Sequence, residues 1–264
     1  MKSPRTIEEL SEILRISTTA CTLPSQDNRL DLSNLTGIEE LRKEDMVVKV
    51  RAGTLVKELQ DELATNGLAL PLSLQHTWHA GPCTQLHEFL NLNFPHVLMA
   101  QHGSWRDWVI GATFVLADGS ICKSGSSVVK SVAGFDVHKF LIGSMGEFAV
   151  WGSAIMRVVS TKSVKLTRIQ GDFDAPIAFV QRVQAPDFEK AKAHAAASDM
   201  ASCTLWHTES PARFQGDSLI DAQGISADPL PHQDLLRRAK DRFDPMNKLI
   251  GGLLSAEKSG RPVK

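Results

Sequence analysis

Residues 108–123 constrain the fold more strongly than any other part of this chain. Residues 108–116 (WVIGATFVL) are rich in β-branched, aromatic and small side chains, which predicts a strand. The dipeptide Asp118-Gly119 is typical of a tight hairpin turn, and residues 120–123 predict the return strand. A hairpin surrounded by short helices and turns indicates an α+β protein and disfavours a doubly wound parallel sheet.

Helices and strands of ordinary length are expected on both sides of the hairpin. Residues 6–14 predict a helix with Thr6 as its N-cap, and Glu9 stands three residues later as in a capping box. Further helices are expected at residues 55–66, 136–141, 187–197 and 233–242, and strands at residues 46–50, 68–72, 148–159 (interrupted by Gly152), 164–170 and 204–207. Residues 73–101 show no clear period apart from a helical stretch at 87–92, and residues 216–231 are expected to form a loop.

The composition disfavours several classes of protein. The 264 residues carry a formal net charge of -1, so no basic surface for nucleic acid is expected, and no apolar run is long enough for a membrane span. The N-terminus lacks a long apolar region, so no secretory signal is expected. The four cysteines, Cys21, Cys83, Cys122 and Cys203, lie far apart, which favours reduced thiols and a cytoplasmic location.

A group of histidines between positions 76 and 102 raises the question of a metal site. His76 and His79 have the spacing of two ligands on one helical face, but Pro71, Gly81 and Pro82 interrupt that segment. No HExxH pattern occurs either. No metal site is therefore expected, and a metallohydrolase is the least favoured of the functions considered.

Two glycine-containing segments point to a ligand. In residues 143–150 (GSMGEFAV), two glycines frame a passage from helix to strand, where backbone N–H groups can approach a pyrophosphate or a flavin edge. Residues 128–136 (VVKSVAGFD) place Lys130, Gly134 and Asp136 between two structured elements. Each feature also has an ordinary structural interpretation, as a turn, a solvated lysine or a helix cap.

These segments resemble the FAD domain of the vanillyl-alcohol oxidase/p-cresol methylhydroxylase (PCMH) superfamily, and within it the FAD-binding subunit of glycolate oxidase. VKSVAGFD at residues 129–136 is similar to the family's VKNVAGYD, and GSMGEFAV is similar to its GSxGxLxV. Further similar pieces are Arg106-Asp107 before Val109-Ile110-Gly111, the turn at residues 116–119, LDLSNLTGI at 30–38, Ala52-Gly53-Thr54 within 47–59, and RFDP at 242–245. The likeness covers roughly residues 30–72, 103–160 and 233–252, in the family's order.

The resemblance implies an organisation and a function. It implies a PCMH-type FAD-binding domain at residues 1–160, a reduced α+β cap at residues 161–232, and a C-terminal helix and polar tail at residues 233–264 that return to the FAD domain. It implies FAD as the cofactor, oxidation of a small 2-hydroxy acid, and other subunits of an oxidase complex as partners. The cofactor-binding residues that it implies are Arg106, Asp107, Lys130, Ser131, Gly134, Asp136, Gly143, Ser144, Gly146, Ala149 and Val150.

The sequence departs from the family at the loops that bind the pyrophosphate. Residues 17–28 contain no glycine where the family has Gly-Gly-Gly-Thr, and residues 77–80 (TWHA) stand in place of Thr-Leu-Gly-Gly. Each lost backbone donor is expected to cost about 1 kcal/mol. These departures leave an alternative open, a catalytically degenerate subunit with a structural or regulatory role. No catalytic residue is assigned, because the chain has no tyrosine and a base at His79 or His102 rests on location alone.

Overall fold

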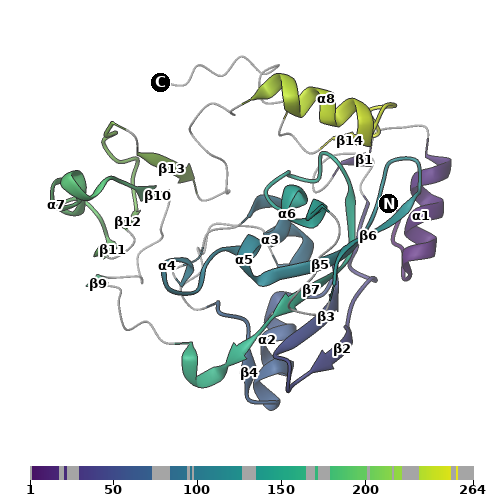
Figure 1. The fold of residues 1–264 in the computed structure, drawn as a ribbon, viewed down its shortest axis with the longest axis horizontal. Coiled ribbons are helices and arrows are strands. Elements are labelled where there is room, and N and C mark those ends of the chain that lie inside the picture. The colour runs from purple at the N-terminus through teal and green to yellow at the C-terminus, as the bar shows by residue number, and fades with distance from the viewer. Residues whose placement is uncertain are drawn as a thin grey trace.

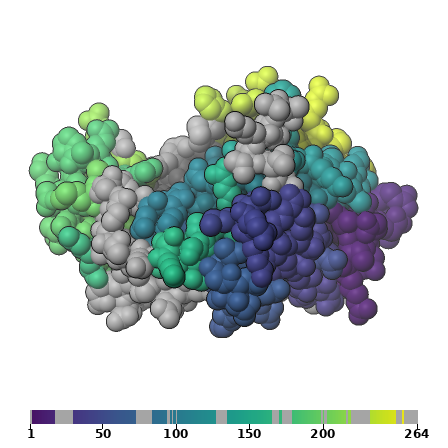
Figure 2. Space-filling view, turned by 60° about the horizontal axis from the view of Figure 1, so that its bottom comes forward, coloured from purple at the N-terminus to yellow at the C-terminus, as the bar shows by residue number. Residues whose placement is uncertain are grey.

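The fold consists of a large body and a small cap (Figure 1). The computed structural model describes residues 2–17, 21–22, 30–72, 84–93, 96, 98–126, 135–164, 170–171, 179–200, 203–215, 217–221, 232–250 and 254. We call the described residues 2–164 and 232–250 the body, and residues 170–221 the cap. Figure 2 shows the cap, in green, at one end of the molecule and the N-terminal helix, in purple, at the other.

An antiparallel sheet of five strands forms the centre of the body. Its order is β2 (Ile38–Arg42), β3 (Val47–Arg51), β7 (Val150–Arg157), β5 (Val109–Val115) and β6 (Ile121–Gly125). The predicted hairpin is confirmed as β5 and β6, and the side chain of Asp118 accepts a hydrogen bond from the Ser120 amide at 2.8 Å in the turn. The expected α+β class is therefore correct, since every strand pair in this sheet is antiparallel.

Gly152 interrupts the ladder between β5 and β7, as its place in the sequence predicted. Thr113 pairs with Ser153 and Phe114 pairs with Trp151, so Gly152 is the extra residue of a bulge. A Cβ at Gly152 would lie 2.4 Å from Cδ1 of Ile7 in helix α1 (Ile7–Ile16). Glycine at this position therefore lets α1 pack closely against the sheet.

The two faces of this sheet have different environments. One face is apolar and fully buried: Val48, Val50, Ala154 and Met156 join the core together with Leu59 and Leu63 of helix α2 (Val56–Thr65). Helices α3 (Leu86–Leu92) and α5 (Trp105–Trp108) add Leu90 and Trp105 to the same core. The other face carries charged and polar side chains, and α1 covers only part of it.

The remaining body elements are short, apart from α8 with its 11 residues. They are α4 (Met99–His102), α6 (Val137–Leu141), 3-10 helix η2 (Thr161–Ser163), the antiparallel pair β4 (Leu68–Ala69) and β8 (Val159–Ser160), helix α8 (Gln233–Phe243), and the parallel pair β1 (Cys21–Thr22) and β14 (Leu249–Ile250). The pairing of β14 with β1 brings the C-terminal segment back to the N-terminal part of the body, as Figure 1 shows. In the LDLS segment at residues 30–33, Leu30 forms an isolated bridge with Lys2.

The cap is a second antiparallel sheet with one short helix. Its strand order is β13 (Ser218–Asp221), β10 (Phe179–Arg182), β12 (Thr204–His207), β11 (Ala197–Asp199) and β9 (Gln170–Gly171), and 3-10 helix η3 (Ala185–Asp187) leads into helix α7 (Phe188–Lys192). Val183, Phe188, Ala191 and Leu205 form a small core inside the cap. Val180, Ala197 and Trp206 belong instead to the large core of the body.

Two expectations for the cap were wrong. The helix expected at residues 187–197 ends at Lys192, because the amide of Ala196 donates to the Trp206 carbonyl at 2.8 Å and Ala197 begins β11. Sheet pairing thus overrides the helix propensity of an alanine-rich stretch. The loop expected at 216–231 contains β13, and most of the strand expected at 164–170 lies outside the described residues. Among the helices described, none is long and apolar enough to cross a membrane.

Candidate functional site

The loop expected to carry Lys130, Ser131 and Gly134 lies outside the described residues, but both of its ends are described. The amide of Ser126 donates to the Ile110 carbonyl at 3.3 Å, which ties the start of the loop to β5. The hydroxyl of Ser124 donates to the Phe135 carbonyl at 3.1 Å, which ties its end to β6. The body therefore fixes both ends of this segment beside the same hairpin.

A buried pair, Ser124 and His138, also holds the end of this loop in place. Oγ of Ser124 lies 3.0 Å from Nδ1 of His138, and the His138 backbone amide also donates to this Oγ at 3.3 Å. Because the hydroxyl proton goes to Phe135, we assign the Nδ1–H tautomer to His138. Burial lowers the pKa of His138, so the ring stays neutral at pH 7. Neither residue lies in a recognisable motif, so the sequence alone does not predict this pair.

The turn at residues 143–146 caps the end of α3. Its backbone is left-handed at Gly143 (φ 81°), Met145 (φ 55°) and Gly146 (φ 76°). The amide of Gly143 donates to the Leu90 carbonyl at 2.9 Å, and that of Met145 donates to the Asn91 carbonyl at 2.8 Å. The turn therefore satisfies carbonyls that the end of a helix leaves unpaired.

These backbone hydrogen bonds reduce the number of amides in the turn that can contact a cofactor. The amide of Ser144 also donates within the chain, to the Leu141 carbonyl at 3.2 Å. The amides of Gly143 and Ser144 are thus already engaged, and any contact of these residues with a cofactor falls to other atoms. Gly146 follows in the same turn, while Ala149 and Val150 are buried at the entry to β7, so their predicted contacts stay predictions.

Two buried polar oxygens beside Gly143 provide a test of whether this turn fits FAD. Oγ of Ser144 and Oδ1 of Asn93 have no hydrogen-bond partner among the described residues. A buried hydroxyl without a partner costs about 1–3 kcal/mol, which a polar ligand can offset. The Asn93 side chain and the Gly143 backbone are in contact, because a Cβ at Gly143 would lie 3.3 Å from the Asn93 Cβ. A neutral donor and a neutral acceptor at a glycine turn suit the polar edge of a flavin nucleotide.

The predicted residues Arg106 and Asp107 have different roles in the structure. Nη2 of Arg106 donates to the Ile142 carbonyl at 3.1 Å, so this side chain reaches the same turn. The carboxylate of Asp107 accepts the Ser104 amide at 2.7 Å and caps α5. Asp136 is the N-cap residue of α6 but makes no side-chain capping bond; it is largely exposed and lies 3.5 Å from Nζ of Lys139.

Four of the described histidines, His87, His96, His138 and His207, are buried. Burial lowers the pKa of His87 to about 4, against the opposing charge of Asp31, and lowers that of His96 to about 3. His96 packs 4.5 Å from the ring of Trp108. No three potential metal ligands gather anywhere in the described part of the chain, and His76 and His79 lie outside it. Nε2 of His102 is buried without a partner among the described residues, so its role as a base stays a hypothesis.

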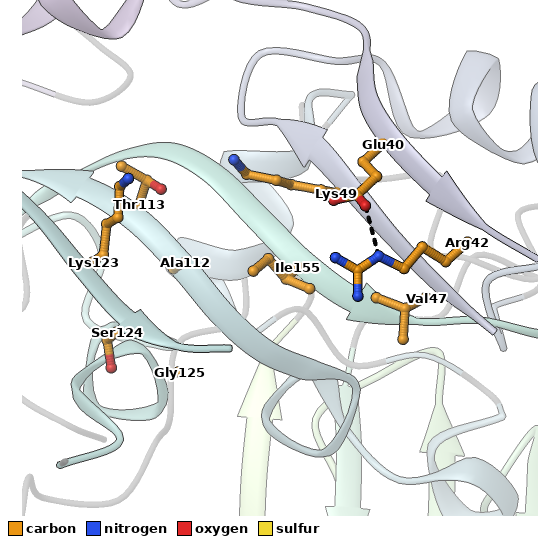
Figure 3. A pocket seen from close by; sticks show the side chains of 10 residues that line it. All are labelled: Glu40, Arg42, Val47, Lys49, Ala112, Thr113, Lys123, Ser124, Gly125 and Ile155. Carbon is orange, nitrogen blue, oxygen red and sulfur yellow. Dashed lines mark hydrogen bonds and ion pairs between the residues drawn. The ribbon is translucent and has the colours of Figure 1, made fainter. Parts of the chain in front are cut away.

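The open face of the body sheet carries a charged groove (Figure 3). Cavities of about 180 and 390 Å³ adjoin there and share Lys49, Thr113 and Lys123 in their walls. Glu39 lies 2.8 Å from Nζ of Lys49, and this contact holds the pKa of Glu39 below its ordinary value although burial acts the other way. The groove lies across the sheet from α2 and α3, on the face away from the buried core that holds the glycine turn.

The first half of the chain is similar to a known family of domains. The family model described as "FAD binding domain" matches residues 3–125. The chain is 27% identical over 184 residues to glycolate oxidase subunit GlcD of Bacillus subtilis, which is 62% of this chain and 38% of that protein. It is 31% identical over 129 residues to a mitochondrial D-lactate dehydrogenase [cytochrome] of Arabidopsis thaliana, 49% of this chain and 22% of that protein.

The fold comparison leads to the same class. 6-Hydroxy-D-nicotine oxidase of Arthrobacter nicotinovorans superposes with a TM-score of 0.50 at 16% identity, over 73% of this chain and 41% of that one. The protein therefore has the PCMH-type fold, and its residues 3–125 are similar to FAD binding domains. Its curated relatives include the glycolate oxidase subunits GlcD and GlcE, the latter from Escherichia coli at 25% identity over 149 residues, 54% of this chain and 40% of that protein. The chain matches less than half the length of each of these relatives.

Proposed function

We propose that this protein is an FAD-dependent oxidoreductase that oxidises a small 2-hydroxy acid to the corresponding 2-oxo acid. The names of its relatives support the substrate class, because glycolate, D-lactate and D-2-hydroxyglutarate are all 2-hydroxy acids. The observation that carries the proposal is the buried Ser144 hydroxyl, which has no partner among the described residues and lies at a glycine turn of a chain whose residues 3–125 match an FAD binding domain. This group needs a polar ligand, and the flavin nucleotide is the ligand that the family implies.

The chain and the cofactor contribute differently to such a reaction. When bound, FAD would supply the acceptor for the hydride of the carbon that carries the hydroxyl group. The protein's own residues hold that cofactor in place. The Ser124–His138 pair anchors one loop beside it, and Arg106 together with the amides of residues 143–145 fixes the glycine turn. A base must also take the hydroxyl proton of the substrate.

In this proposal, the cap forms the part of the site that binds the substrate. Its sheet turns Val180 and Trp206 towards the body, where both are buried in the common core. This packing excludes water from one side of the body, which strengthens electrostatic contacts with a bound acid.

Partners and location are further parts of this proposal. Two relatives are named as subunits of glycolate oxidase, so we propose that this chain also works beside other subunits of an oxidase complex. A cytoplasmic location is supported by the scattered cysteines. The side chains of Cys122 and Cys203 are described, and neither is in a disulfide.

One observation favours a second candidate, a flavin-fold subunit that has lost catalysis. Residues 17–28 contain no glycine, although the family uses a glycine loop there to wrap the pyrophosphate. The loss of several backbone donors at about 1 kcal/mol each would weaken FAD binding by roughly a thousandfold. Such a protein would keep the fold and serve as a structural or regulatory subunit.

Reconstitution with FAD separates the two candidates. The purified protein is incubated with FAD, and uptake is measured by equilibrium dialysis and by the visible absorbance of the bound flavin. Anaerobic addition of glycolate, D-lactate or D-2-hydroxyglutarate should then bleach that absorbance if the chain is an oxidoreductase. Uptake of FAD without bleaching by any 2-hydroxy acid, or no uptake at all, would refute the first candidate and favour the second.

A further inference from the structure

A group of four buried charged residues links the C-terminal segment to the glycine turn. Lys240, Asp244 and Lys248 come from α8 and the residues after it, and Glu147 follows directly after Gly146. All four side chains are nearly inaccessible to solvent, with exposed fractions between 2% and 7%. Two ammonium groups and two carboxylates balance one another, so the cluster carries no net charge.

Lys240 uses its ammonium group to join three segments. Nζ donates to the Glu147 carbonyl at 2.7 Å, to Oδ2 of Asp244 at 2.9 Å, and to the carbonyl of Leu249 in β14. Three donors thus meet three acceptors, which is the full capacity of an ammonium group. Two of the acceptors are backbone carbonyls, so the bond to the glycine turn does not depend on the Glu147 side chain.

Asp244 holds the C-terminal segment in the shape that this contact needs. Its Oδ1 accepts the Lys248 amide at 2.8 Å, and its Oδ2 accepts the Leu249 amide at 2.6 Å. The ammonium group of Lys248 then donates to the carbonyls of Leu14 and Ala117, each at 3.2 Å. The two lysines of this segment therefore reach two different places, Lys240 the glycine turn and Lys248 the end of α1 and the hairpin.

The hydrogen bond from Lys240 fixes the plane of the peptide between Glu147 and Phe148, directly after the turn. In a trans peptide the carbonyl of one residue and the N–H of the next point in opposite directions. The Glu147 carbonyl points at Lys240, so the Phe148 amide points away from α8. The side chain of Phe148 is clamped as well, since its ring lies 4.7 Å from Phe140 and 6.0 Å from Phe243 of α8.

We propose that Lys240 is a positioning residue for FAD: its bond to the Glu147 carbonyl orients the Phe148 amide and the strand entry after it for contact with the cofactor. This inference rests on the proposed binding of FAD. It gives the C-terminal helix a role in cofactor affinity that its distance in sequence from the glycine turn would not suggest. The carboxylate of Glu147 lies 3.3 Å from the same ammonium group and balances its charge.

The test compares two variants that share one substitution. Glu147→Gln removes the carboxylate but keeps the carbonyl bond, whereas Glu147→Gln with Lys240→Met removes that bond and leaves the buried charges balanced. The dissociation constant for FAD, measured by quenching of flavin fluorescence, should stay within about threefold of wild type in the first. In the second it should rise at least tenfold. Equal affinities in the two variants would overturn the proposal.

Hydrogen exchange of the FAD-free proteins provides a readout that a purely structural role would not reproduce. Amides of residues 145–150 should exchange faster in the double variant than in Glu147→Gln, while those of the β5–β6 hairpin should not change. Equal acceleration in both regions would mean a general loss of stability and would also overturn the proposal. Should the double variant fail to fold, Lys240→Gln replaces Lys240→Met in the same background, under the same criteria.

The outcome for wild type separates this inference from the proposed function. If wild type takes up no FAD, the proposed function and the positioning role both fail. If wild type binds FAD and the double variant binds it equally well, only the positioning role fails. Lys248→Met is the matched control, because it removes a second buried lysine of the same segment that does not contact the glycine turn.

Discussion

The body and the cap of this protein are both built on five-stranded antiparallel sheets, but they are stabilised in different ways. In the body, one sheet face is covered by helices and contributes to a continuous core. In the cap, the buried residues that the structure describes in the internal core are Val183, Phe188, Ala191 and Leu205. The opposite cap face adds Val180, Ala197 and Trp206 to the core of the body. We infer that the cap depends on the body for its stability, whereas the body is stabilised by its own core.

The largest effect is expected from the residue that joins the two cores. Trp206→Ala removes a side chain that is 1% exposed, and truncation of a buried aromatic residue typically costs about 3–5 kcal/mol. Since this contact holds the cap on the body, the cap should unfold first. Urea unfolding followed by far-UV circular dichroism should show an early transition for the cap, and limited proteolysis should cut within residues 170–221. A single transition of unchanged midpoint would contradict the dependence of the cap on the body.

Leu205→Ala tests the internal core of the cap, on the sheet face opposite Trp206. The leucine is fully buried in the small cap core, and its truncation should cost about 2–5 kcal/mol. None of the described residues of the body belongs to that core, so the later urea transition, that of the body, should keep its midpoint. The matched control is Leu59→Ala, a fully buried leucine of α2, which should lower the stability of the body instead. If Leu205→Ala destabilises both parts equally, the two cores are not separate.

Acid should affect the body through its buried histidines. In the folded state burial lowers the pKa of His87 to about 4 and that of His96 to about 3, whereas in the unfolded chain both lie near 6.5. Below pH 6.5 the unfolded chain therefore binds more protons, so this stability is present above pH 6.5 and is lost as the pH falls towards 4. Between pH 7 and pH 5.5 the loss should be roughly 1 kcal/mol for each histidine. Urea titrations at both pH values measure it, and His96→Phe should remove about half of the difference.

The sequence predicted the body well and the cap poorly, for a physical reason. In the body the signals are local: Thr6 accepts the Glu9 amide at 3.2 Å as an N-cap, Asp118-Gly119 forms its turn, and Gly152 forms its bulge. In the cap the decisive contacts join residues far apart in the sequence. Ala196 bonds to Trp206 and β13 pairs with β10, and no local pattern announces either contact.

The candidate site divides in the same way. Arg106 and the turn from Gly143 to Gly146 follow from motifs, and the structure brings them together at Ile142. The Ser124–His138 pair and the Lys240 cluster depend on side chains that meet only in the folded chain. Motifs therefore locate the segments of the site, but they do not reveal the buried groups that hold those segments in position.

The smallest expected effect concerns Asp107, which the motifs suggested as a cofactor residue and which caps α5. Asp107→Ala removes the acceptor for the Ser104 amide and should lower the free energy of unfolding by about 1 kcal/mol. FAD affinity should stay within twofold of wild type, because the Asp107 carboxylate is already engaged in capping helix α5. Asp136→Ala is the matched control, since Asp136 makes no capping bond and its loss should change stability by less than about 0.5 kcal/mol. Should Asp107→Ala instead weaken FAD binding strongly while leaving stability unchanged, Asp107 is a cofactor residue, and the part of the body that touches FAD extends from the glycine turn to the start of α5.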